Sequence, residues 1–169
     1  NLRSAKLRNA NLAGADLSRA DLTGADLTGA NLTGANLRGA KLTNAILKSS
    51  KLGKANLTGA SAAKADFTNA SGIKANLSYI NLTGATLVNT NLTSAKLTSS
   101  YLLQANLTGA NLSSITAMYS NMTSVNLTSA NLTNATIDYA FMLGAITTGS
   151  VQTGTIFTGT QMPNGTIQK

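Results

Sequence analysis

A five-residue repeat runs through most of this sequence and limits what the chain can fold into. Residues 20–39 read ADLTGADLTGANLTGANLRG. Leu occupies 22 of the 29 positions 2, 7, 12 and so on to 142, the others being Ala62, Phe67, Gly72, Ala117, Met122, Ile137 and Met142. Ala lies two residues before the Leu at most repeats. In chain order, we call the five places the Ala, Asx, Leu, Thr and turn positions.

Neither regular secondary structure accommodates a period of five. An α-helix advances about 100° per residue, so the Leu side chains would spiral around every face. In a straight strand side chains alternate with period two, so successive Leu residues would point to opposite faces. An extended chain that bends once every five residues keeps both the Leu and the Ala positions inward. Four such bends close a square coil of about 20 residues, and stacked coils form parallel ladders about 4.8 Å apart.

The turn positions support bends at these places. Gly recurs there, as at Gly14, Gly24 and Gly29, and suits a turn that needs a positive φ. Asn, Ser, Lys or Tyr occupies other turn positions, which predicts that a second turn type is also used. The Thr and Asx positions are expected to face outward, and Thr suits a strand surface.

The tandem A(D/N)LXX pattern resembles the pentapeptide-repeat family across residues 1–145. The resemblance implies an all-β fold, a right-handed quadrilateral parallel β-helix (β-solenoid) of about seven coils of four pentapeptides. The tail GTQMPNGT is similar to the ends of cyanobacterial members. We interpret residues 146–169 as a C-terminal cap that covers the last Leu layer and blocks the open strand edge. No matching cap precedes Asn1, so we expect the N-terminal end to associate with itself or with a missing upstream segment.

Composition argues against catalysis and metal binding. The chain has no Cys, His or Glu, and its acids are Asp16, Asp21, Asp26, Asp66 and Asp138. No base is therefore present to activate a Ser or Thr nucleophile, and no spaced His or Cys could hold a metal. We expect a non-enzymatic protein without catalytic, cofactor-binding or metal-binding residues. Repeated Asn-Leu-Thr and Asn-Leu-Ser triplets are interpreted as products of the repeat rather than as glycosylation sites.

One coil departs from the Leu ladder at Ala62, Phe67 and Gly72. A pocket is one interpretation. We favour volume exchange, in which a large side chain compensates for two small ones. A local bulge after Gly72 that turns Ile73 inward is a further expectation.

The positive charge raises the question of polyanion binding. The net charge is +8, and residues 1–76 hold 11 basic residues against four acids, a net of +7. Folding at 20 residues per coil spreads these residues over all four faces as a belt, which favours solubilising charge over a nucleic-acid site. The candidate polyanion contacts are Arg3, Arg8, Arg38, Lys48, Lys51, Lys54 and Lys74.

Large apolar side chains gather at one corner of the expected coil. We call this set the Tyr corner: Tyr79, Tyr101, Leu103, Met118, Tyr119, Tyr139, Phe141 and Leu143. A contiguous exposed patch of this kind marks a contact surface. Stacking of Tyr residues between coils is the alternative interpretation.

The sequence favours a structural or interaction scaffold of unknown biological role. Its partner is either an unknown protein or a second copy of the chain, bound through the N-terminal end or the Tyr corner. A weak binder of nucleic acid or anionic membrane is the alternative. A DNA-mimic regulator of topoisomerase, known among similar proteins, is least favoured because that role needs acidic faces. No transmembrane segment is visible, and the compartment is unknown, with a cytoplasmic location weakly favoured.

Overall fold

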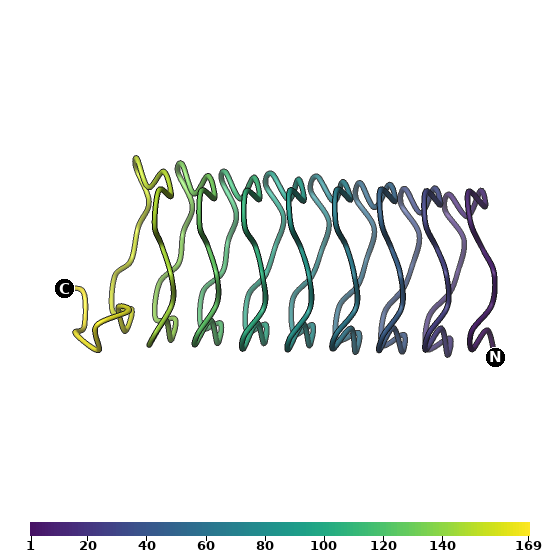
Figure 1. Cartoon of the computed structure of the whole chain (residues 1–169), viewed down its shortest axis with the longest axis horizontal. Coiled ribbons are helices and arrows are strands. Elements are labelled where there is room, and N and C mark those ends of the chain that lie inside the picture. Colours follow the sequence, from purple (N-terminus) through teal and green to yellow (C-terminus); the bar gives the residue numbers. More distant parts are fainter.

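The chain forms a straight rod of stacked coils, with its two ends at opposite ends of the rod (Figure 1). This is a computed structural model, and it describes all residues, 1–169. The rod contains no helix and no continuous β-strand, and its regular elements are isolated β-bridges. Colour changes steadily along the axis in Figure 1, so neighbouring coils are also neighbours in sequence.

The bridges repeat with a period of 20 residues. Each Asx position pairs in parallel with the residue 20 positions later, from Lys6 with Asp26 to Phe141 with Gln161. At the first of these bridges the Asp26 N–H donates to the Ala5 carbonyl at 2.9 Å, and the Leu7 N–H donates to the Asp26 carbonyl at 2.7 Å. The register never slips between these ends. The predicted parallel β-helix with four bends in each coil is confirmed.

The core is a continuous ladder of the Leu and Ala positions. Leu22, Leu27 and Leu57 have no exposed surface, and 45 buried hydrophobic residues form one cluster. Full burial of one such Leu side chain stabilises the fold by about 1.5–3 kcal/mol. Leu2 and Leu7, in the first coil, are only partly buried. The inward assignment of these positions is therefore confirmed along the rod.

All corners from Ser4 to Gly159 share a positive φ at the turn position, with values of 52° at Ser4 and 67° at Gly14. No Thr position has a positive φ, so by the sign of φ every corner matches a type II turn. The prediction of a second turn type is wrong. A bond to the next coil, such as the Tyr79 N–H with the Thr98 carbonyl, imposes this geometry on non-glycine residues too.

The irregular coil around Gly72 keeps its register. Phe67 is buried, and a cavity of only about 10 Å³ lies beside it among apolar side chains. A Cβ at Gly72 would lie 2.8 Å from Leu92 Cδ2, so the neighbouring Leu already occupies that space. Ile73 is 40% exposed, and Ser71 keeps its bridge to Asn91. The expectation of a bulge that turns Ile73 inward is wrong, because the ladder holds the Thr position outside.

The C-terminal segment continues the coil before it reverses. Parallel bridges extend to Gln161, but Thr147 and Gln152 place polar side chains at the Leu position. The chain then turns back, and Ile167 forms an antiparallel bridge with Gln161. This hairpin lies over the final coil, beside the C-terminus in Figure 1. The boundaries 146–169 for a cap stay a prediction.

Candidate functional site

The Asx position supplies a hydrogen-bond acceptor to the corner that follows it. At Asn56, Oδ1 accepts the Thr58 N–H at 3.1 Å and the Thr58 hydroxyl at 2.6 Å. The same pair of bonds joins Asn106 with Thr108. No backbone carbonyl accepts the Thr-position N–H, so this side chain satisfies a group that would otherwise lack a partner. The Asn-Leu-Thr triplets therefore have a structural explanation.

In the basic half, hydrogen bonds from the following Thr residue also stabilise the ionised carboxylates of Asp residues at the Asx position. The hydroxyl and N–H of Thr23, with a smaller contribution from Arg3, lower the pKa of Asp21 to about 2. Bonds from Thr28, aided by Arg8, also lower the pKa of Asp26. These carboxylates are stabilised as anions. They therefore act as fixed negative charges rather than as proton donors near neutral pH.

The structure divides the candidate polyanion contacts into two groups. Arg3 pairs with Asp21 at 3.3 Å, Arg8 with Asp26 at 3.1 Å, and Lys48 with Asp66 at 3.2 Å. Each pair joins a Thr position to the Asx position of the next coil. The remaining candidates form no ion pair: Arg38, Lys51, Lys54 and Lys74.

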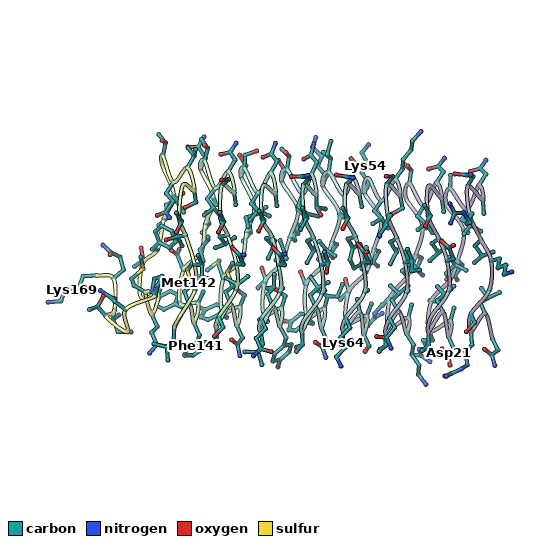
Figure 2. The ribbon with its side chains drawn as sticks, in the orientation of Figure 1. Asp21, Lys54, Lys64, Phe141, Met142 and Lys169 are labelled. Atoms are coloured by element: carbon teal, nitrogen blue, oxygen red, sulfur yellow. The ribbon has the colours of Figure 1, made fainter.

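The basic residues do not follow one line along the rod. Figure 2 shows Lys54 and Lys64 on opposite edges. Lys54 and Lys74 share a column on adjacent coils, whereas Arg38 belongs to another face. The charge thus forms a belt around the rod rather than a groove-tracking stripe.

The Tyr corner is exposed and partly stacked. The rings of Tyr119 and Tyr139 lie 5.3 Å apart at an interplanar angle of 11°. The two side chains nevertheless remain 56% and 49% exposed. Tyr139 also lies over Gly159, where a Cβ would meet its ring carbons at 2.5 Å. Intramolecular stacking is therefore present, and it leaves about half of each residue open to solvent.

The other members of the Tyr corner lie around this stack. Tyr101 and Phe141 share one column, each bridged to Asn121 between them, and both are 55% exposed. Leu103 and Met118 are half-buried, and Leu143 is exposed. Tyr79 is separated from the stack by the coil that carries Ser99, so it stands apart. Figure 2 shows Phe141 at the edge of the rod, whereas its neighbour Met142 points inward.

Sequence reasoning missed four further exposed apolar residues at this end of the rod. Ile146, Val151, Ile156 and Ile167 are 49–59% exposed. The first three occupy Asx positions of the last coil, where the two preceding coils carry Asn or Thr. That change of residue type at one repeat position is the signal that could have found them. Only Ile167 joins the column of Phe141, through its bridge to Gln161, whereas Ile146, Val151 and Ile156 each lie on a different side of the coil.

No group of three or more acidic, His or Cys side chains comes together to hold a metal ion. The structure contains no helix with the length and hydrophobicity required to span a lipid bilayer.

Similar short units stacked into one continuous core define this protein as a solenoid repeat protein, in which each unit contacts only its neighbours. The family described as Pentapeptide repeats matches in eight copies, over residues 1–39, 20–59, 50–87 and 75–113. The chain belongs to the pentapeptide-repeat family. No curated protein sequence matches it.

Solved structures similar to the rod include two pentapeptide repeat proteins. HetL, a pentapeptide repeat protein involved in heterocyst differentiation regulation from the cyanobacterium Nostoc sp. strain PCC 7120, is 31% identical, with a TM-score of 0.54. That match covers 96% of this chain and 78% of HetL. Rfr23 from the cyanobacterium Cyanothece 51142 is 27% identical over 66% of this chain and 63% of its own, with a TM-score of 0.43. A trypsin-treated form of QnrB1, a plasmid-mediated fluoroquinolone resistance protein, is 16% identical over 89% of this chain and 82% of its own, with a TM-score of 0.47.

Proposed function

We propose that this protein is a non-enzymatic interaction scaffold whose Tyr corner binds a second copy of the chain or a protein partner. The scaffold is a right-handed rod, with about seven coils in residues 1–145 and a cap in residues 146–169. The observation that carries the proposal is the exposure of Tyr119, Tyr139 and Phe141, each about half open on one corner. Contiguous apolar surface of this kind is characteristic of contact sites.

The chemistry of the corner suits a protein contact. Tyr and Phe contribute large rigid contact areas, and interface cores are enriched in aromatic residues and poor in charge. Outside this end, the Asx and Thr positions carry mainly Asn, Thr and Ser, which already bond to one another within the corners. Ile167, bridged to Gln161 in the column of Phe141, enlarges the same surface.

Light scattering and thermal melting of one variant test this function. Tyr119→Ser, Tyr139→Ser and Phe141→Ser together remove the aromatic surface without touching the core. We expect association to be lost, with a decrease in stability limited to the stacking energy of about 0.5–1.5 kcal/mol. A matched control, Leu2→Ser with Leu7→Ser, changes the N-terminal end and should leave this contact intact. If the wild type is monomeric and the triple variant loses much stability, the interface proposal is contradicted. The Tyr corner would then serve only to stabilise the rod through stacking within the chain.

A second candidate function is weak binding of polyanions. It is supported by the exposed basic residues that lack an ion pair, including Arg38, Lys51 and Lys54. The paired Arg3, Arg8 and Lys48 are less available, since each already faces an aspartate. The net positive charge argues against mimicry of DNA.

A further inference from the structure

A hollow on one corner of the rod is lined by arginine, glycine and tyrosine. The turn positions of four successive coils there are Arg19, Gly39, Gly59 and Tyr79. Two turn positions without a side chain thus lie between two turn positions with large side chains. The hollow has a volume of about 550 Å³, within the range of small-molecule sites. Its remaining lining residues are Ser18, Asn36, Arg38 and Thr58.

The floor of the hollow is open backbone. A Cβ added at Gly59 would meet no heavy atom within 4 Å, and one at Gly39 would lie 3.7 Å from Arg19 Cγ. The stem of Arg19 therefore lies over Gly39. The N–H groups of both glycines bond to the next coil, but their carbonyl oxygens accept no hydrogen bond from the chain. Both carbonyl oxygens are therefore free of hydrogen bonds within the chain, as at the other turn positions.

Two guanidinium groups originate side by side at one end of the hollow. The Arg19 N–H donates to the Arg38 carbonyl at 2.8 Å, so the two side chains leave neighbouring points of the backbone. Neither arginine forms an ion pair. The nearby carboxylate of Asp16 instead accepts the Ser18 N–H and the Asn36 amide. Both guanidinium groups are therefore available for an external anion.

The far end of the hollow offers an aromatic face. Tyr79 is 61% exposed and belongs to no ring stack within the chain. It lies three coils from Arg19, about 14 Å along the axis at the usual spacing between strands. A ligand that reaches both ends must combine an anionic group with a planar ring.

We propose that this hollow binds a small phosphate monoester that carries a planar ring, such as a mononucleotide. The fork geometry of Arg19 and Arg38 suits bidentate contact with phosphate oxygens. The carbonyls of Gly39 and Gly59 accept hydrogen bonds from hydroxyl or amino groups of the ligand. The ring of Tyr79 stacks on the ligand ring. This site lies on the same corner of the rod and includes Tyr79 of the Tyr corner, but Tyr79 is two coils away from the Tyr119–Tyr139 stack on which the proposed scaffold contact depends.

The test is a titration of the full chain with AMP, ribose 5-phosphate and inorganic phosphate, followed by calorimetry and by amide chemical shifts. We expect saturable binding of AMP, weaker binding of ribose 5-phosphate, and shifts centred on Gly39 and Gly59. The double variant Arg19→Gln/Arg38→Gln should weaken AMP binding about tenfold or more, because charge-assisted hydrogen bonds are lost. Tyr79→Ser should weaken AMP binding and leave phosphate binding unchanged.

Two controls separate a built site from general electrostatic attraction. Lys54→Gln/Lys74→Gln removes the same charge from another face and should change AMP affinity by less than about twofold. Gly59→Asn, which tolerates the positive φ, fills the hollow without changing charge and should abolish binding. The proposal is overturned if AMP does not bind saturably, if both double variants weaken binding equally, or if Gly59→Asn binds as well as the wild type.

Discussion

Ser50 gives the sharpest prediction about stability, because its buried hydroxyl has no hydrogen-bond partner. It occupies an Ala position, is 1% exposed, and lies at a site where most repeats carry Ala. Ser100 occupies the equivalent position two and a half coils later with the same burial, but its Oγ donates to the Leu97 carbonyl at 2.6 Å. Ser50 and Ser100 therefore allow an unsatisfied hydroxyl to be compared with a satisfied one at the same repeat position and the same burial.

The two substitutions should change stability in opposite directions. An unsatisfied buried hydroxyl costs about 1–3 kcal/mol, and Ala fits this position elsewhere in the rod. We expect Ser50→Ala to raise the free energy of unfolding by about 1–2 kcal/mol, or about 2–8 °C in Tm for a chain of this length. Ser100→Ala should lower it by about 0.5–1.5 kcal/mol, the net value of one hydrogen bond.

Urea denaturation and thermal melting, both followed by circular dichroism, measure the two variants against the wild type. Because repeat arrays can lose two-state behaviour, the midpoints of both transitions should agree before a free energy is assigned. A loss of stability in Ser50→Ala comparable to that in Ser100→Ala would refute the reasoning. It would show that the Ser50 hydroxyl turns to the Leu47 carbonyl in the way that Ser100 bonds to Leu97.

Three other predictions follow from the core, the carboxylates and the basic belt. Leu57→Asp should prevent folding, because it places a charge in a dry core, whereas Leu7→Asp in the half-open first coil should leave a measurable melting transition. The lowered pKa of Asp21, about 2, means that its stabilisation is complete above about pH 4 and is lost toward pH 2, so Asp21→Asn should flatten the fall of Tm in that range. DNA binding by the belt should be weak, independent of sequence and absent at physiological salt; a fluorescence anisotropy titration that still saturates tightly in salt would contradict this.

The repeat period was enough to predict the core, but not the conformation of the corners. Leu57 and Ala55 could be assigned inward because only bends at every fifth residue keep both positions in the core. The conformation at Lys54 and Tyr79 could not be inferred, because local propensity disfavours a positive φ for these residues. Hydrogen bonds between coils override that propensity, and the same bonds keep Ile73 outside.

The surface was predictable in its grouping and not in its contacts. Folding the sequence at 20 residues brought Tyr119 and Tyr139 together, and the structure places their rings in a stack. The ion pair of Arg8 with Asp26 joins residues 18 apart, a Thr position and the Asx position of the next coil. The 20-residue period alone does not indicate that these two positions lie within reach of each other. The hollow beside Arg19 depends on glycine at the turn positions of two successive coils, Gly39 and Gly59, a feature that apolar periodicity does not reveal.

Distance measurement between spin labels tests the scaffold contact most directly, because the chain has no Cys that would interfere. Ser99→Cys places a label between Tyr79 and Tyr119 on the Tyr corner. Ser129→Cys places one in a column half a coil away, at a turn position with a similar φ (54° and 56°). If the contact is between two copies, electron–electron coupling should give a short, defined distance for the Ser99 label in the wild-type background and none once Tyr119, Tyr139 and Phe141 are replaced by Ser. Coupling from the Ser129 label alone, or from neither label at high protein concentration, would contradict self-association through this corner.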